Sequence, residues 1–344
     1  KDIGLGRNSA IASIIHDVVR IAIQQSQPTN ELFNAIRHDY GEEVLGIVLA
    51  LCKISDIKLK VSKEQASDFR DMIVSYSEDP RVILIKLADR LEVMRSLDIF
   101  PEAKRRTKSW ESLNLYAQIA HKLGLYAIKS ELEDLSLKYL ETEAYNHIVH
   151  ELKESEKERM AFIEEFLKPI RELLDRDGLK YHIKSRTKSV YSIFQKMRKQ
   201  KVSFKGVYDI FALRIIIDCP VEREKALCWT VYSHVASLYT PNPERMRDWI
   251  SIPKSNGYES LHTTVSAGGG KWVEVQIRTE RMDEVAERGI AAHWRYKGVK
   301  QGGMGAEEWL QRLREMLEDT TSESIAHRFS ERPTTNEIFV FTPS

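Results

Sequence analysis

The sequence is poor in cysteine and in long apolar runs. Its three cysteines, Cys52, Cys219 and Cys228, have no CxxC spacing, so they indicate neither a disulfide framework nor a zinc knuckle, and small buried thiols in a reducing compartment are the simpler interpretation. No apolar run reaches the ~18 residues that a membrane span needs, and no signal peptide is recognisable. We therefore expect a cytoplasmic protein without a membrane partner.

The sequence also lacks an excess of charge of either sign. Its 52 Lys and Arg residues balance 51 Asp and Glu residues, which leaves a formal net charge of +1. Such a balance gives no overall attraction to nucleic acid or to an anionic membrane. A binding site for phosphate groups must therefore come from a local cluster of cations.

The length of 344 residues predicts two domains, since domains typically run to about 100–150 residues. Residues 1–150 show helical periodicity, as in RVILIKLADRLEVM, and the charged amphipathic stretch 151–178 predicts a bridging helix. From residue 179 to about 330, β-branched and aromatic runs separated by glycine turns predict an α+β domain. The chain starts at Lys1 and stops just after the strand-like IFVF, so we expect a fragment of a longer protein.

A cationic segment opens the second domain. Between Tyr181 and Lys201 there are seven Lys or Arg residues and no Asp or Glu. If the segment RTKSVYSIFQKMRKQK is one helix, Lys188, Ser192 and Lys196 share one face and an apolar stripe lies opposite. A solvated basic surface is the simpler alternative, but the lack of acidic partners favours a cradle for a polyphosphate.

Two carboxylates lie on predicted strands of the same domain. Asp209 starts DIFALRIIID, and in VEVQIRT the alternation places Glu274, Gln276 and Arg278 on one face. Carboxylates from neighbouring strands suit Mg²⁺, which usually takes one or two of them together with substrate phosphates. Taken singly, each carboxylate has an alternative interpretation as a solubilising charge at a sheet edge.

The stretch RMRDWISIPKSNGYESLHTTV surrounds a predicted glycine turn with polar side chains. Tyr258, next to that turn, suits stacking on a purine, while Asn256 and His262 suit bonds to its ribose or phosphates. Without context, a structural role for His262 is an equal alternative. Three cations precede the turn, namely Arg245, Arg247 and Lys254.

These blocks resemble a known family. In order and spacing, RTKSVYSIFQKM, DIFALR, SIPKSNGYESLHTTV, VEVQIRT and GIAAHWRYK resemble the synthetase domain of long Rel/SpoT-type (p)ppGpp synthetase/hydrolases. The helical half resembles the HD hydrolase domain of that family through IIHDVV, VILIKLADR and YAQIAHKLGLYAIKSELEDL. TNEIFVFTP resembles the start of the family's TGS domain and places it at 331–344.

The resemblance implies a nucleotidyltransferase-like mixed sheet with GTP diphosphokinase activity. In that activity the 3′-oxygen of GDP or GTP attacks the β-phosphorus of ATP, which releases AMP and forms an alarmone of the ppGpp type. It implies that Asp209 and Glu274 hold Mg²⁺. The ATP-side positions are Arg186, Lys188, Ser192, Lys196 and Arg214, with Arg245 and Arg247 in a basic loop typical of bifunctional members. The acceptor-side positions are Lys254, Asn256, Tyr258, His262 and Gln276.

The resemblance of the helical half is less complete. His16, Asp17 and Asp89 match metal ligands of the family's hydrolase site, which implies Mn²⁺. However, Arg20 and Ile21 stand where the family has a catalytic Glu-Asp pair, and these side chains cannot run acid-base chemistry. An arginine there also adds charge of the sign of the metal.

Two further differences from the family concern the same site. Glu92 and Val93 replace a His-Asn pair, and the family's first metal-binding histidine lies upstream of this chain. We therefore expect a degenerate hydrolase. The alternative is a bifunctional enzyme that hydrolyses ppGpp at this site.

Two interpretations from other classes remain open at the level of sequence. A nucleotidyltransferase acting on nucleic acid would share the carboxylates and the cations, but it predicts a wide basic surface and binding that weakens steeply with salt. A nucleotide-sensing interaction module would need no intact pair of carboxylates. Contact with the ribosome is expected only of the family's C-terminal region, which this chain lacks.

Overall fold

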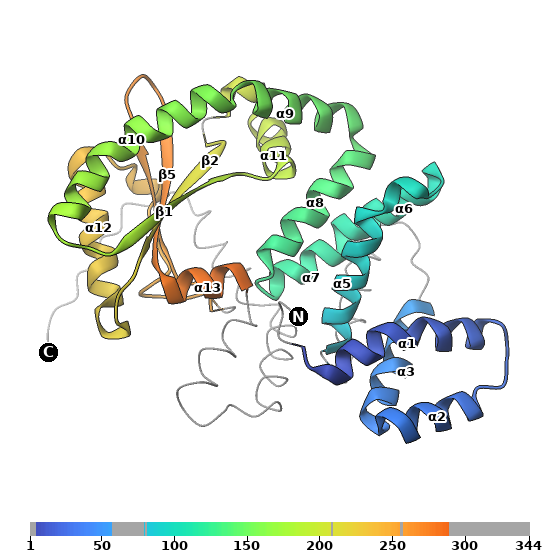
Figure 1. Cartoon of the computed structure of the whole chain (residues 1–344). Coiled ribbons are helices and arrows are strands. Elements are labelled where there is room, and N and C mark those ends of the chain that lie inside the picture. Colours follow the sequence, from blue (N-terminus) through green and yellow to red (C-terminus); the bar gives the residue numbers. More distant parts are fainter. Residues whose placement is uncertain (1–4, 57–78, 80, 208, 255–256, 289–344) are drawn as a thin grey trace, which may run out of the picture.

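The computed structural model describes residues 5–56, 79, 81–207, 209–254 and 257–288. An α-helical half comes first and a mixed sheet with flanking helices follows, as the resemblance implied (Figure 1). None of the described helices combines the length and the hydropathy that crossing a bilayer demands. The predicted start of a TGS domain at 331–344 lies outside the described residues.

The described part of the helical half consists of helices. Its periodic segment 83–94 forms a helix whose Leu84 and Leu87 are fully buried, whereas Ala88 of the same apolar repeat is exposed. The helices are α1 (Arg7–Gln24), α2 (Asn30–Tyr40), α3 (Glu42–Asp56), α5 (Arg81–Arg95), α6 (Glu102–Glu111), α7 (Ala117–Lys122), α8 (Tyr126–Leu140) and α9 (Thr142–Glu154), with a short π-helix at Ser112–Tyr116 between α6 and α7.

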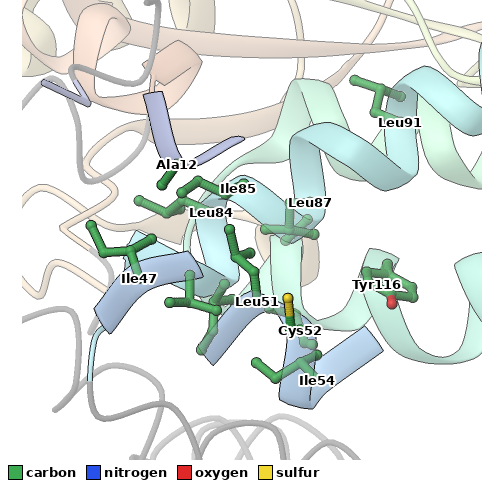
Figure 2. Packing of buried hydrophobic residues seen from close by; sticks show 14 of the residues in the cluster. Ala12, Ile47, Leu51, Cys52, Ile54, Leu84, Ile85, Leu87, Leu91 and Tyr116 are labelled. Carbon is green, nitrogen blue, oxygen red and sulfur yellow. The ribbon is translucent and has the colours of Figure 1, made fainter. Parts of the chain in front are cut away.

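One hydrophobic core holds this half together. Figure 2 shows Leu51 and Cys52 of α3 beside Leu84 and Leu87 of α5, with Tyr116 nearby. Burial of such apolar side chains contributes about 1.5–3 kcal/mol each relative to exposure. Between α7 and α8 the chain turns at Gly124, whose φ of +69° other residues rarely adopt.

The second half contains a mixed sheet with the strand order β1-β2-β5-β4-β3. β2 and β5 are parallel neighbours in its middle, and the other pairs are antiparallel. The strands are β1 (Tyr181–Thr187), β2 (Phe211–Ile217), β3 (Arg247–Asp248), β4 (Leu261–Ser266) and β5 (Trp272–Thr279). Within the described residues, four helices accompany the sheet: α10 (Glu156–Arg176), α11 (Val190–Gln200), α12 (Glu224–Leu238) and α13 (Glu280–Arg288).

The helix expected to bridge the domains packs on the sheet. Phe166 and Ile170 of α10 share a core with Val231 of α12 and Val275 of β5, and the two helices lie on the same side of the sheet in Figure 1. The domain boundaries at 150, 178 and 330 stay predictions, but α10 contributes to the core of the second half. α8 and α9, in contrast, contact α11.

Candidate active site

The two carboxylates predicted to share a site are brought together by the sheet. Glu274 lies on β5 opposite Ala212 of the parallel strand β2, and Asp209 lies in the segment just before β2. The ammonium nitrogen of Lys188 is 2.9 Å from Asp209 Oδ2 and 2.6 Å from Glu274 Oε2. Since one nitrogen contacts both oxygens, the carboxylates converge on one point. Glu274 lies on a middle strand and not at an edge of the sheet, whereas Asp209, predicted at the start of a strand, precedes β2, which begins at Phe211.

The predicted helical face that included Lys188 is wrong in part. Arg186 belongs to β1, and Lys188 lies in the link between β1 and α11. The helix starts later because Ser189 caps it: its hydroxyl accepts a hydrogen bond from the N–H of Ser192 at 3.2 Å. Ser192 and Lys196 are on α11 as predicted, and Lys196 also bonds Asp209.

Electrostatics keeps both carboxylates ionised. Burial alone would raise the pKa of Asp209, but Lys188 and Lys196 bring that pKa below its ordinary value. Burial likewise opposes ionisation of Glu274, and Lys188 lowers its pKa. The site therefore holds two negative charges close together at neutral pH, as a divalent cation requires.

The donor set fits a hard cation. Carboxylate oxygens are the ligands that Mg²⁺ prefers, and one or two of them usually suffice when phosphates and water complete the shell. Asp209 Oδ2 and Glu274 Oε2 meet this description because both already face one positive group, the ammonium of Lys188.

A cavity of about 280 Å³ opens beside Lys188. Residues expected on the ATP side and residues expected on the acceptor side share its wall: Arg186, Lys188, Ser192 and Arg214 with Lys254, Tyr258, His262 and Gln276. Asn256, the remaining acceptor-side residue, lies outside the described residues.

A second cavity, of about 370 Å³, has both carboxylates in its wall. Asp209, Glu274 and three predicted ATP-side cations line it, namely Lys196, Arg245 and Arg247. Lys188 and His262 line both spaces. The predicted ATP-side residues are thus divided between two neighbouring cavities.

Tyr258 is held by polar contacts at its hydroxyl. The hydroxyl lies 2.7 Å from His262 Nε2 and accepts a bond from Arg278 Nη2 at 3.2 Å. Burial lowers the pKa of His262 to about 4, so the imidazole is neutral at physiological pH. The residue before the tyrosine, Gly257, has a φ of +76°, which fits the predicted glycine turn.

Arg278 joins the site although sequence analysis gave it no role. It is 1% exposed, and it donates to Gln276 Oε1 at 2.5 Å. Burial lowers the pKa of its guanidinium. Its Nε and Nη1 have no hydrogen-bond partner among the described residues. The alternation in VEVQIRT places Arg278 on the same face as Glu274, and this pattern could have indicated that Arg278 belongs to the site.

Tyr126 and Ser130 of α8 also line the first cavity. They belong to the helical half, and nothing in their local sequence indicates a nucleotide site. The Tyr126 ring meets the Tyr258 ring edge-on, with centroids 5.9 Å apart. Only the packing of the two halves against each other places them there.

The predicted hydrolase residues have cationic partners. Asp17 accepts bonds from Arg20 at 2.7 and 3.0 Å, and Asp89 accepts one from Lys86 at 3.2 Å. His16 is buried, and its Nδ1 contacts the carbonyl of Ser13 at 2.9 Å. Within the described part of the chain, no three His, Cys, Asp or Glu side chains gather into a metal-binding group.

A helical domain with an HD motif, followed by a mixed sheet that joins two carboxylates to a row of cations, defines a class of two-domain nucleotide enzymes. Family comparison makes this specific. Residues 185–301 match the region found in RelA and SpoT proteins, and residues 1–126 match an HD domain. The chain therefore contains the region found in RelA and SpoT proteins together with an HD domain.

Curated relatives align over nearly the whole chain. The guanosine-3′,5′-bis(diphosphate) 3′-pyrophosphohydrolase of Aquifex aeolicus is 39% identical over 99% of this chain and 48% of its own length. The GTP pyrophosphokinase of Myxococcus xanthus is 37% identical over 99% of this chain and 45% of its own length. The bifunctional (p)ppGpp synthase/hydrolase SpoT of Escherichia coli is 37% identical over 98% and 47%. The chain thus spans about half the length of these relatives.

Among solved structures, small alarmone synthetase 1 of Bacillus subtilis bound to its product pppGpp matches 50% of this chain and 91% of its own. Its sequence identity is 26% and its TM-score is 0.29.

Proposed function

We propose that the chain transfers pyrophosphate from ATP to the 3′-hydroxyl of GDP or GTP and releases AMP. The observation that carries this proposal is the convergence of Asp209 and Glu274 on one ammonium group, next to a cavity that also holds the Tyr258 ring. The RelA/SpoT match of residues 185–301 supports the same reaction. The retained pair of carboxylates speaks against a module that only senses nucleotides.

In the proposed reaction Asp209 and Glu274 hold Mg²⁺, which neutralises charge on the phosphate oxygens when bound. Lys188, Lys196 and Arg214 position the triphosphate, since little covalent chemistry is left to the protein in phosphoryl transfer. Tyr258 stacks on the guanine of the acceptor. Its ring is well suited to this because its hydroxyl is already fixed by His262 and Arg278.

The test is formation of AMP and ppGpp from ATP and GDP with Mg²⁺, followed by anion-exchange chromatography. Asp209→Asn and Glu274→Gln each remove one negative metal ligand and should abolish product. Glu164→Gln is the matched control, because Glu164 lies on α10, pairs with Arg171 and lines neither cavity. Full activity in either carboxylate variant refutes the assigned metal ligands, and an inactive wild-type chain refutes the proposed reaction.

A second candidate function is hydrolysis of ppGpp at the HD site, since two of the relatives are named as hydrolases or bifunctional enzymes. We infer that this site binds Mn²⁺ weakly. Arg20 forms an ion pair with Asp17, and Lys86 forms one with Asp89. A metal ion that binds both carboxylates must therefore displace Arg20 and Lys86. The hydrogen bond from Arg20 lowers the pKa of the Asp17 carboxyl.

Incubation of the chain with ppGpp and Mn²⁺ tests this inference. We expect pyrophosphate release near the blank, and a higher rate in Arg20→Glu, which returns an acidic side chain to this position. Steady release by the wild-type chain contradicts the inference.

A further inference from the structure

One stripe of α8 faces the cavity, although α8 belongs to the helical half. Tyr126, Ser130 and Asp134 are spaced four residues apart, so they lie along the same side of the helix. Tyr126 and Ser130 line the cavity. Asp134 Oδ1 accepts a hydrogen bond from the backbone N–H of Tyr191 at 2.8 Å. The stripe therefore contacts the synthetase half at two places.

The first place is the start of α11. The opening N–H groups of a helix have no partners within the helix and carry partial positive charge, so a carboxylate stabilises them. The first turn of α11 contains no acidic residue, and Ser189 caps only the N–H of Ser192. Asp134 supplies the missing acceptor and the missing negative charge from another domain. Because α11 carries Ser192 and Lys196, fixing its first turn fixes part of the cationic wall.

The second place is the aromatic wall. The Tyr126 ring stands nearly perpendicular to the Tyr258 ring, at an angle of 80°. His121 also packs edge-on against Tyr126, with centroids 5.6 Å apart. An edge-to-face pair of this kind contributes directional preference in addition to burial. Tyr126 thus restricts the orientation of the ring proposed to stack on guanine.

We propose that Asp134 and Tyr126 are positioning residues of the synthetase site: Asp134 fixes the helix that holds the ATP phosphates, and Tyr126 fixes the ring that holds the acceptor base. This inference rests on the proposed function and assigns one residue of α8 to the ATP side and another to the acceptor side. α8, and not α10, then carries the contact between the two halves that the site depends on.

The test measures KM for ATP and KM for GDP separately, on the full chain, in Asp134→Ala, Asp134→Asn and Tyr126→Leu. Asp134→Ala should raise KM for ATP about 2- to 30-fold, which corresponds to the loss of about 0.5–2 kcal/mol typical of a helix cap. Asp134→Asn keeps an acceptor oxygen and should raise it less. Tyr126→Leu should raise KM for GDP about 2- to 13-fold, the range that corresponds to an aromatic pair, and leave KM for ATP unchanged.

Glu131→Ala is the matched control. Glu131 lies on the same helix, but its carboxylate pairs with Arg95 of α5 at 2.6 Å, so its loss weakens α8 without touching the cavity. If Asp134→Ala and Glu131→Ala show equal KM values for ATP, Asp134 has only a structural role and the proposal fails. Should Asp134→Ala not fold, an unchanged KM for ATP in Asp134→Asn has the same meaning. Absence of product with the wild-type chain refutes the proposed function instead.

Discussion

Lys188 holds the two carboxylates of the site together, and replacing it with methionine removes this charge at nearly constant length. In wild type its ammonium bonds Asp209 and Glu274, with side chains 20%, 17% and 18% exposed, respectively. A hydrogen bond to a charged group contributes about 1.5–3 kcal/mol. Lys196 still pairs with Asp209, so the loss falls mainly on Glu274. We expect Lys188→Met to lower the free energy of unfolding by about 1.5–3 kcal/mol.

The assay is thermal unfolding with and without Mg²⁺. The ammonium and a divalent cation compete for the same two oxygens, so Mg²⁺ should stabilise Lys188→Met more than it stabilises wild type. A ligand at a hundred times its Kd adds about 2.7 kcal/mol, which is of the size needed to offset the lost bond. The effect should appear as a larger rise in Tm for the variant.

Lys184→Met is the matched control for this experiment. Lys184 lies on β1 and pairs with Asp283 at 2.8 Å, away from Asp209 and Glu274. Its replacement should cost stability without changing the response to Mg²⁺. Equal Tm rises in wild type and Lys188→Met would refute the idea that the metal and Lys188 share one position.

Three further predictions concern the surroundings of the site. Tyr258→Phe removes the hydroxyl between His262 and Arg278 and should lower the free energy of unfolding in urea by about 1–3 kcal/mol. Tyr258→Ala should also raise KM for GDP about 5- to 150-fold, which is the equivalent of one lost base stack. An unchanged KM for GDP contradicts the stacking role. Glu224→Ala should destabilise the chain by about 1–3 kcal/mol, because it removes the buried acceptor of the Thr279 hydroxyl and one of the two carboxylates that pair with Arg281; a loss well below about 1 kcal/mol, the size of an exposed pair, contradicts this. Burial raises the pKa of Cys228 to about 12, so mass spectrometry should find its thiol unlabelled by iodoacetamide near pH 8, where an unperturbed thiol with a pKa of about 8.5 reacts; labelling as fast as in urea speaks against its burial.

Local patterns in the sequence determined several parts of the site. The alternation of VEVQIRT placed Glu274 and Gln276 on one face of β5, and the structure joins them by a hydrogen bond of 2.9 Å. The apolar spacing within residues 190–197 predicted the buried side of α11, where Ile193 packs with Phe204. Such patterns are readable because a helix or strand repeats over a few residues, so the sequence alone tells which side chains share a face.

Tertiary structure decided which faces meet. Asp209 approaches Glu274 because β2 and β5 are parallel neighbours, although β3 and β4 lie between them in the chain. Contacts between distant segments also determine three further features. These are the start of α11 after Lys188, the burial of Arg278 and the position of α8 beside the cavity. Periodicity within one element carries no information on its neighbours, since strand order and domain packing are set by the burial of many side chains at once. The sequence therefore determined which side chains share a face within each element, and only the folded chain determined which of those faces form the site.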